Sequence, residues 1–167
     1  MDLSICQLVR VMHRKIIFPG TFDPITQGHL ALIHQAIDLF DEVVVGVAAE
    51  GSKNTYFSFE ERLALVENVI DAWPQVYAKG FHGLTADFYR AEGACALLRG
   101  VRDVQDFAYE FQMAQVNQQL NPILKTVLLM PPAAHVWVSA SMVREIARAG
   151  GDVSAFVPPA VAARMRS

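Results

Sequence analysis

The chain has 167 residues, of which 53% are hydrophobic and 19% are charged. This length suits one ordinary domain with a full core, and the composition excludes a disordered or collagen-like chain. The formal net charge is −3, so no overall basic field attracts nucleic acid or an anionic membrane. We expect neither as a partner, and any anionic ligand must be held by a local cluster of donors.

Residues 1–12 precede the first convincing strand and are expected to form a flexible N-terminal extension, which leaves residues 13–167 as a single domain. Polar and charged residues interrupt this segment, so it lacks the apolar core of a signal peptide. The apolar runs of the chain are far shorter than a membrane span. Cys6 and Cys95 lie far apart in the sequence and form no metal-ligand pair. We therefore expect a cytoplasmic protein.

The first half of the chain alternates short apolar runs with amphipathic segments. Residues 43–48 (VVVGVA) are rich in β-branched residues, which is typical of a parallel strand covered on both sides. Ser58 and Glu61 have the spacing of a capping box, which predicts the start of a helix. In chain order the pattern predicts a strand over 15–18, a helix over 28–40, a strand over 43–48, a helix from 58 to about 72 and a weaker strand over 76–79.

The second half continues the same alternation. It predicts a helix over 85–92, a strand over 96–98, a helix over 103–120, a strand over 126–130 and a helix over 141–149 that ends at a left-handed Gly150. In the longest helix Val104, Phe107 and Phe111 share one face. We interpret the aromatic side chains in this half as core residues, namely Phe88, Tyr89, Phe107, Tyr109 and Phe111.

Five alternations of strand and helix predict an α/β fold. The expected architecture is a Rossmann-like single domain, with a five-stranded parallel sheet, right-handed crossovers and helices on both faces. In such sheets ligands bind outside the carboxyl ends of the strands, near the point where the strand order reverses. Residues directly after strands are therefore the candidates for function.

The segment PGTFDPITQGH, residues 19–29, follows the first predicted strand. Gly20 allows a ligand to approach the backbone closely, and the Thr21 hydroxyl is near enough in sequence to face the same pocket. Gly28 and His29 place an imidazole in the first turn of a helix, where free N–H groups and the helix dipole favour an anion. A lone Gly-His pair is more often a capped helix with a surface histidine, but the whole constellation at a strand-to-helix junction favours a ligand site.

The segment RGVR, residues 99–102, follows the fourth predicted strand. Two guanidinium groups at a strand end suit a phosphate or carboxylate held by forked hydrogen bonds. Arginine pairs at helix starts also form ion pairs with acidic neighbours, here Asp103 and Asp106. The residues by themselves leave both interpretations open.

Two further polar positions follow predicted strands. Ser139 and Ser141 open a helix after the fifth strand; a serine there is usually only an N-cap, although a helix N-terminus with two hydroxyls also suits phosphate. Lys53 follows the second strand and is most simply a solvated lysine. Together, three strand ends and two helix N-termini supply donors to one crevice.

Other chemistries lack their motifs. The chain has no Walker A sequence, no GxGxxG after the first strand and no GxSxG nucleophile elbow. His82 and His135 are not spaced as a metal site with His29, and we interpret both as loop residues. The residues themselves thus point to a phosphate-rich ligand in an α/β crevice.

The motifs resemble a known family. Residues 19–29 are similar to the (H/T)xGH signature of nucleotidylyltransferases. The further motifs RGVRD at 99–103, DFxYE at 106–110 and SAS at 139–141 resemble those of bacterial phosphopantetheine adenylyltransferases. The resemblance runs from about Lys15 to the C-terminus. It implies the reaction of ATP with 4′-phosphopantetheine to give dephospho-coenzyme A and pyrophosphate. It also implies magnesium (Mg2+) as cofactor and a homohexameric assembly. We assign no residue of the chain as a metal ligand.

The resemblance also implies roles for individual residues. Thr21 and His29 would meet the α-phosphate under attack, with His29 stabilising the transition state. Lys53 and Arg99 would complete the catalytic set by holding the acceptor phosphate, and Thr85 would line the pantetheine arm. The implied ATP contacts are Thr21, Phe22, His29, Gly100, Val101, Arg102, Glu110, His135, Val136, Trp137, Val138, Ser139, Ala140 and Ser141. No residue is a convincing covalent nucleophile, so we expect direct in-line attack by the acceptor phosphate.

The chain departs from the family pattern at a few places. His135 stands where a tryptophan is common, Ala140 replaces a usual serine, and the first dozen residues are extra. One alternative is a related enzyme that accepts nicotinate mononucleotide or a sugar or glycerol phosphate. Another is a non-catalytic nucleotide sensor on the same fold. Lys53, Thr85 and Arg99 together favour the pantetheine acceptor. The presence of both His29 and the basic cluster favours an enzyme.

Overall fold

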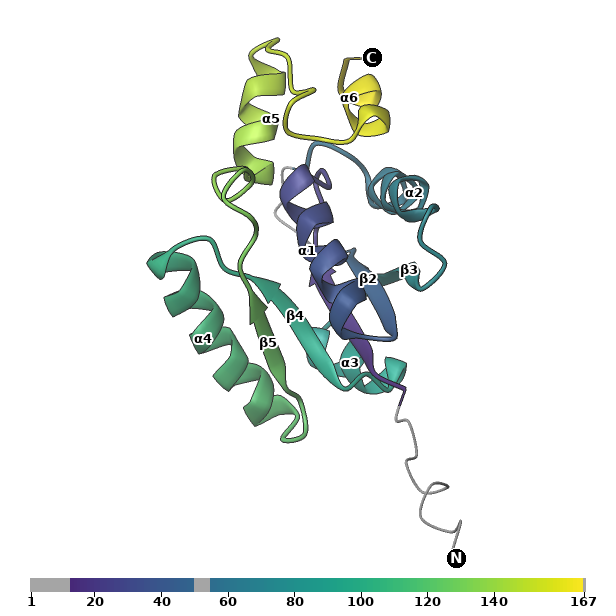
Figure 1. The fold of residues 1–167 in the computed structure, drawn as a ribbon, viewed down its shortest axis with the longest axis vertical. Coiled ribbons are helices and arrows are strands. Elements are labelled where there is room, and N and C mark those ends of the chain that lie inside the picture. Colours follow the sequence, from purple (N-terminus) through teal and green to yellow (C-terminus); the bar gives the residue numbers. More distant parts are fainter. Residues whose placement is uncertain (1–12, 50–54, 167) are drawn as a thin grey trace, which may run out of the picture.

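The computed structural model describes residues 13–49 and 55–166 and contains a five-stranded sheet in the order β3-β2-β1-β4-β5 (Figure 1). Every neighbouring pair of strands is parallel, which confirms the predicted α/β architecture. The strands are β1 (Lys15–Gly20), β2 (Glu42–Ala48), β3 (Val76–Phe81), β4 (Ala96–Gly100) and β5 (Thr126–Leu129). The helices are α1 (Gln27–Leu39), α2 (Phe59–Ile70), α3 (Thr85–Glu92), α4 (Val104–Leu120), α5 (Ala140–Arg148) and α6 (Pro159–Arg166). None of these helices is long and apolar enough to cross a membrane.

Most predicted elements occur where the sequence places them. The capping box of Ser58 and Glu61 is present at the start of α2, and Gly150 is left-handed with a φ of 77° after α5. Strands β1 and β4 extend to Gly20 and Gly100, beyond the predicted ends, because each glycine still pairs with a residue of the neighbouring strand. Helix α6 was not predicted. Its sequence signal is the proline that begins it, since proline is favoured at the first helical position.

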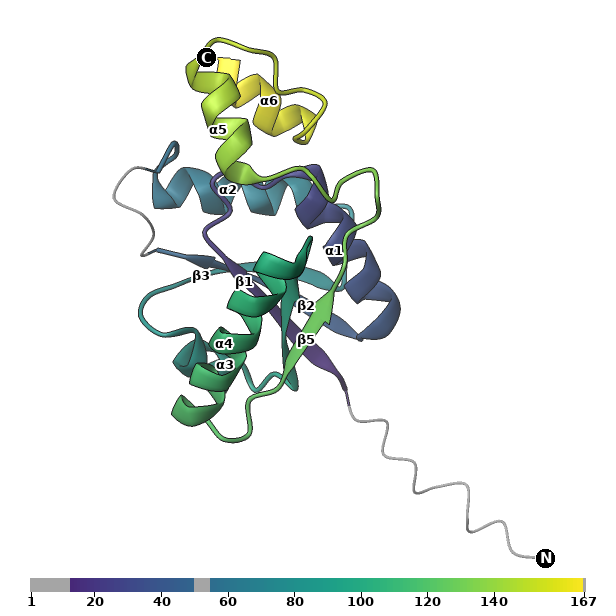
Figure 2. The same ribbon diagram turned by 90° about the vertical axis from the view of Figure 1, so that its left-hand side faces the viewer.

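The sheet separates two layers of helices, as the side view in Figure 2 shows. Helices α1, α2, α5 and α6 pack on the face that carries Val43, Val45 and Val47, whereas α3 packs on the face that carries Val44. All four valines are inaccessible to solvent, which explains the continuous apolar run of β2. On the α3 side, Gly46 makes room for the Phe88 ring, because a Cβ there would lie 2.6 Å from Phe88 Cε1.

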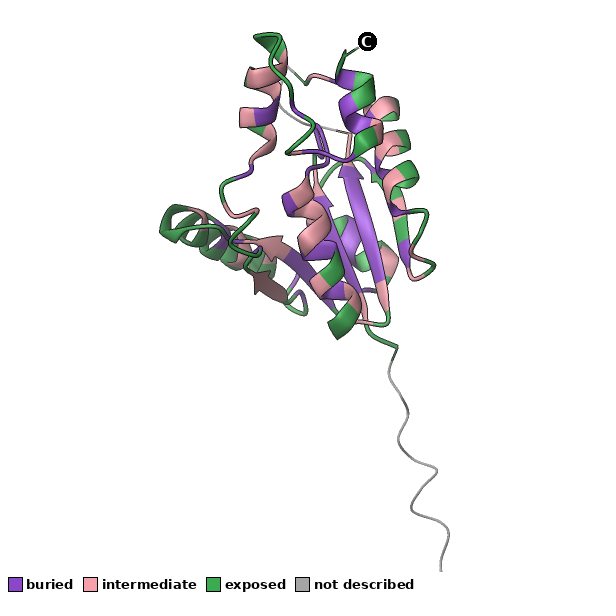
Figure 3. Ribbon diagram, turned by 45° about the horizontal axis from the view of Figure 1, so that its top comes forward, coloured by how far each residue is buried: buried purple, intermediate pink, exposed green. Residues whose placement is uncertain are grey.

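Helix α4 corrects one sequence prediction. Phe88 and Tyr89 are buried as expected, but Phe107, Tyr109 and Phe111 are about half exposed, at 50%, 58% and 54%. Figure 3 shows this outer helix largely in the colour of exposed residues. Helical periodicity identifies which residues share a face but not what covers that face, and only Glu110 is buried on α4. The aromatic residues of α4 are therefore not part of this chain's core.

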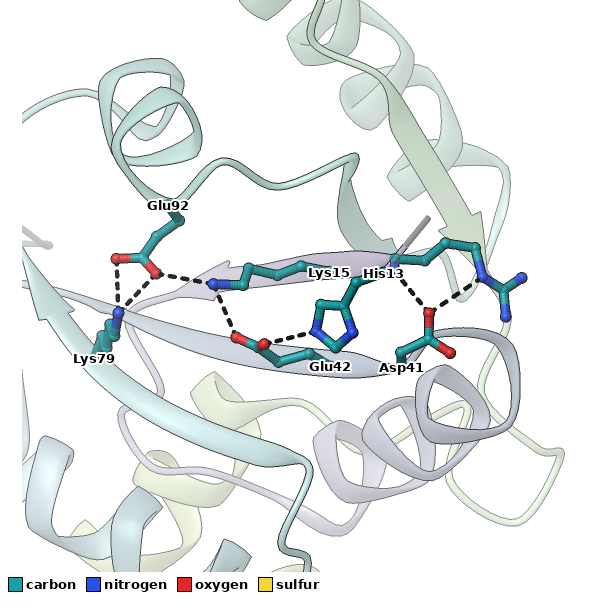
Figure 4. A network of polar contacts seen from close by, with 7 residues as sticks. His13, Lys15, Asp41, Glu42, Lys79 and Glu92 are labelled. Atoms are coloured by element: carbon teal, nitrogen blue, oxygen red, sulfur yellow. Dashed lines mark hydrogen bonds and ion pairs between the residues drawn. The ribbon is translucent and has the colours of Figure 1, made fainter. Parts of the chain in front are cut away.

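A chain of ion pairs connects the end of the sheet where β1 and β2 begin with α3 (Figure 4). Lys15 Nζ lies 2.9 Å from a carboxylate oxygen of Glu42 and 3.8 Å from one of Glu92. His13 contacts Glu42, and Lys79 contacts Glu92 at 2.7 Å. Burial acts to raise the pKa of Glu42, but hydrogen bonds from Lys15 and His13 outweigh it and lower the pKa. These acidic and basic side chains neutralise one another and connect the starts of β1 and β2 with the end of α3.

Candidate active site

A cavity of about 640 Å³ opens at the carboxyl ends of β1 and β4. The strand order reverses between these two strands, because β1 is followed along the chain by β2 on one side and β4 returns on the other side. The loop after β1, the loop after β4 and the start of α5 line the cavity. This is the position at which the sequence predicts a ligand.

His29 is locked in place by the first turn of α1. Thr26 is the N-cap of this helix, and its side chain accepts a hydrogen bond from the His29 N–H. In return, the Thr26 N–H donates to His29 Nδ1 over 3.0 Å. Because Nδ1 is an acceptor, the proton of the neutral imidazole belongs on Nε2. His29 lines the cavity and is thus a preorganised hydrogen-bond donor.

The surroundings keep the His29 imidazole uncharged. Its pKa is lowered from 6.5 to about 4, mainly by burial and in addition by the nearby positive charges of Arg102 and Arg99. The rings of Phe18 and Phe22 lie against it, with centroid distances of 6.0 and 5.1 Å. At neutral pH the His29 imidazole is therefore uncharged.

Arg99 is held by a fork of hydrogen bonds. Its Nε and one Nη donate to the two carboxylate oxygens of Glu110 over 2.7 and 2.6 Å, and the other Nη donates to the Pro19 carbonyl over 2.8 Å. Glu110 is only 7% exposed, whereas the Arg99 side chain keeps 32% of its surface exposed. The forked contact therefore orients the guanidinium and leaves part of it accessible from the cavity. Arg99 lines the cavity, but its acidic partner is Glu110 and not Asp103 or Asp106, the neighbours that the sequence suggested. Binding of a phosphate by Arg99 stays a prediction.

Arg102 repeats this arrangement nearer to solvent. Its Nε donates to Asp106 over 2.8 Å, and this hydrogen bond is the main cause of the raised pKa of Arg102. Asp106 is one of the two acidic neighbours that the sequence suggested, whereas the Asp103 side chain caps α4 by accepting from the Asp106 N–H. The cations after β4 thus carry matched carboxylates before any ligand binds.

The start of α5 supplies hydroxyl groups to the cavity. Ser139 is the N-cap and its side chain accepts from the Met142 N–H over 3.2 Å, as the cautious interpretation of this serine predicts. The Ser141 hydroxyl accepts a hydrogen bond from Arg144, and Ala140 also lines the cavity. The hydroxyl hydrogens of both serines remain available to donate.

Asp23 joins three segments around the cavity. Its carboxylate accepts from the N–H groups of Tyr56 and Phe57 over 2.7 and 3.0 Å, and its carbonyl accepts from Arg144 over 2.6 Å. Asp23 is 2% exposed. Neither Asp23 nor Arg144 was predicted as a site residue. The local signal at Asp23 is the proline that follows it, and an Asp-Pro pair is typical of a turn.

The structure brings together most of the predicted site residues. Those that line the cavity are Thr21, Phe22, His29, Thr85, Arg99, Gly100, Arg102, Glu110, His135, Val138, Ser139, Ala140 and Ser141. Val101, Val136 and Trp137 are not among its lining residues, and the exposed Trp137 ring packs instead against Phe156. Lys53 lies outside the described residues.

The cavity offers no dedicated cage of metal ligands. Within residues 13–49 and 55–166, no group of three or more His, Cys, Asp or Glu side chains is placed to hold an ion. His82 and His135 lie in loops, as predicted. A magnesium ion with water and phosphate ligands needs few protein ligands, so the residues present fit an ion that arrives with a nucleotide.

The pKa of His29 is directly testable. In an NMR titration of the imidazole protons, we expect His29 to titrate at about pH 4. The reason is that a protonated imidazole would be buried away from water and close to two guanidinium groups. The spectrum of a His29→Asn variant identifies the resonance. Titration of His29 at its ordinary pKa would contradict its burial beside Arg99 and Arg102.

The same shift makes stability depend on pH. The unfolded chain binds this proton below about pH 6.5 but the folded chain only below about pH 4. Between these values the unfolded state carries more protons, so the free energy of unfolding decreases as the pH falls through this window. The His29→Asn variant should lose this part of the pH dependence in urea titrations.

Comparisons with known proteins identify the family of this chain. The cytidylyltransferase-like family model matches residues 17–146. A phosphopantetheine adenylyltransferase of Thiobacillus denitrificans is 50% identical over 149 residues, which cover 89% of this chain and 93% of the relative. One from Azoarcus is 50% identical over 150 residues, covering 90% and 92%, and one from Methylacidiphilum infernorum is 48% identical over 150 residues, covering 89% and 87%.

A solved structure shares the fold at much lower identity. It is described as a candidate nicotinate-nucleotide adenylyltransferase from Vibrio parahaemolyticus, and it superposes with a TM-score of 0.69 at 17% identity, covering 92% of this chain and 91% of the other. At this identity the likeness establishes the fold alone. The matched family model and the relatives at about half identity establish more: this chain belongs to the cytidylyltransferase-like nucleotidyltransferases and, among them, to the phosphopantetheine adenylyltransferase family.

Proposed function

We propose that the chain transfers the adenylyl group of ATP to 4′-phosphopantetheine, giving dephospho-coenzyme A and pyrophosphate in coenzyme A biosynthesis. The relatives at about 50% identity carry this activity in their names. The observation that carries the proposal in this chain is His29, a neutral imidazole whose Nε2 proton is left for a ligand beside two arginines. Such a site suits a reaction at a phosphate.

The chemistry needs no covalent intermediate. An oxygen of the acceptor phosphate attacks the α-phosphorus of ATP, a new P–O bond forms, and the bond to the bridging oxygen breaks as pyrophosphate leaves. The attacking phosphate is already anionic near neutral pH, so no strong general base is required. Negative charge builds on the α-phosphate oxygens, and we assign His29 Nε2–H and the Thr21 hydroxyl as the donors that stabilise it.

The acceptor is proposed to bind on the side of Arg99. Two Arg99 nitrogens are bound to Glu110 and one to the Pro19 carbonyl, which fixes the plane of the guanidinium while N–H groups remain for a phosphate. Thr85 begins α3 and lines the same cavity, consistent with a place along the pantetheine arm. The proposal retains Lys53 as a second cation for the acceptor phosphate. ATP would lie between residues 100–102 and the start of α5.

Magnesium is proposed to enter with the triphosphate of ATP. Bound in this way, the ion would neutralise charge on the phosphates and on the leaving pyrophosphate. The residues that would meet the resulting complex are Arg102 and the hydroxyls of Ser139 and Ser141, all of which line the cavity. We place the reaction in the cytoplasm, where ATP is available.

Pyrophosphate release tests the function. We expect release from ATP with 4′-phosphopantetheine and none with pantetheine, because only the former carries the attacking phosphate. His29→Ala should fold and lower kcat by roughly a hundredfold or more, the scale for loss of one preorganised donor. The acceptor panel also includes nicotinate mononucleotide and glycerol phosphate. If no acceptor causes release of pyrophosphate, the proposal that the chain is an enzyme is refuted. If only another phosphate compound causes release, that compound and not 4′-phosphopantetheine is the acceptor.

Glu110 is the residue whose role the structure questions. The family resemblance makes it an ATP contact, but its two oxygens bind Arg99. We expect Glu110→Gln to raise KM for 4′-phosphopantetheine roughly tenfold, an effect of about 1.4 kcal/mol, while Kd for ATP in calorimetry changes little. Asp106→Asn is the matched control, because it releases Arg102 on the proposed nucleotide side. If Glu110→Gln instead raises only the Kd for ATP, Glu110 contacts ATP directly, as the family resemblance implies.

Assembly as a homohexamer is part of the proposal. It is supported by the apolar residues that a single chain leaves open on α4 and around β5, which include Val104, Phe107, Phe111, Val116 and Met130. Covering them removes apolar area from water, which stabilises association. Sedimentation velocity should give a particle of six chains at micromolar concentration, and a monomer would contradict the assembly.

A further inference from the structure

Arg62 of α2 is buried directly behind the wall of the cavity. It is 2% exposed and is not among the lining residues. One of its Nη atoms donates to the carbonyl oxygens of Thr21 and Ala48 over 2.5 and 2.8 Å, and the other donates to the Ala49 carbonyl over 3.4 Å. One guanidinium therefore connects the loop after β1 with the end of β2.

This placement is energetically costly. Among the described residues, Arg62 donates only to neutral carbonyl oxygens and forms no ion pair with a carboxylate. Asp23 and Glu60 act on its charge only through space. Burial lowers its pKa, as expected for a cation removed from water. The Phe59 ring, 5.7 Å from the guanidinium carbon, compensates in part. An apolar side chain would fill the space at lower cost, which points to a local use for the charge.

The contact with Thr21 decides where the next N–H group points. The Thr21–Phe22 peptide is trans, so its C=O and N–H groups point in opposite directions. With the Thr21 oxygen turned toward Arg62 and α2, the Phe22 N–H is turned to the cavity side, where Phe22 is a lining residue. Within the described part of the chain this N–H has no acceptor. Phe22 also has a φ of 47°, an uncommon conformation for a residue with a side chain.

We infer that Arg62 is a positioning residue, which holds the Thr21–Phe22 peptide so that the Phe22 N–H donates to an oxygen of the α-phosphate beside His29. The inference rests on the proposed adenylyl transfer. Phe22 and His29 both line the cavity, and their ring centroids lie 5.1 Å apart, so the two residues are neighbours in its wall. Because Arg62 also holds the carbonyls of Ala48 and Ala49, it fixes the two strand ends relative to each other.

Two substitutions at position 62 test this role. Arg62→Lys keeps the charge but replaces the fork by a single point donor, and Arg62→Met removes the charge while filling the space. If Arg62 acts through the Phe22 peptide, kcat per folded molecule should fall roughly tenfold or more in both variants, and further in Arg62→Met. KM for ATP should change by less than about threefold, since the donor matters most when charge develops. Arg90→Lys on the exposed face of α3 is the control.

Circular dichroism and thermal unfolding give the folded fraction of each variant. If Arg62 contributes only to stability, the folded fraction decreases but kcat per folded molecule does not. Retention of wild-type kcat by the folded Arg62→Lys protein would overturn the inference. Wild-type pyrophosphate release is measured first, which separates failure of the proposed function from failure of this inference.

A measurement on the wild-type protein does not depend on the variants folding. In protein labelled with 15N at phenylalanine, the Phe22 amide proton should shift downfield when ATP is added, as expected for a new hydrogen bond to phosphate. An unchanged Phe22 amide in protein saturated with ATP would overturn the inference. The same signal in ATP-bound Arg62→Lys should show a smaller shift if the peptide has lost its orientation.

Discussion

The carboxyl end of β1 is the point on which the site depends. β1 lies between β2 and β4, so the chain order of the strands reverses at this strand. The segment that leaves β1 therefore lies at the crevice between the β2 side and the β4 side of the sheet. This segment carries Thr21, Phe22 and Asp23, and it continues directly into the helix that holds His29. Parallel pairing of six residues of β1 with β2 fixes where the segment begins, and Arg62 and Asp23 fix its course beyond the strand.

Positive charge in the cavity is arranged in pairs with acidic side chains. Arg99 binds Glu110, Arg102 binds Asp106, and Arg144 lies 3.8 Å from the Asp23 carboxylate. Each pair holds a guanidinium in one orientation without a ligand, which reduces the ordering that binding has to supply. The pairs also explain how an acidic chain with a net charge of −3 concentrates donors for phosphate in one place.

Neutral His29 complements these cations. A protonated imidazole next to Arg99 and Arg102 would be repelled, and the lowered pKa expresses that repulsion together with burial. In the proposed reaction, a neutral donor would contribute a directed hydrogen bond that becomes stronger as charge develops on the phosphate. The capping exchange with Thr26 provides the direction, since it occupies Nδ1 and leaves the proton on Nε2.

Local patterns in the sequence determined most of the fold and much of the site. Apolar runs of β-branched residues define the strands, the spacing of Ser58 and Glu61 starts α2, and Gly28-His29 places an imidazole in the first turn of a helix. These features act over a few residues, so they can be recognised without knowing the rest of the chain. Tertiary structure alone decided the partners that come from distant segments, such as Glu110 for Arg99 and the carbonyls held by Arg62. It also decided that the aromatic residues of α4 face outward. Burial, charge pairing and the lowered pKa of His29 depend on which surfaces meet in three dimensions, and periodicity along one helix carries no information about that.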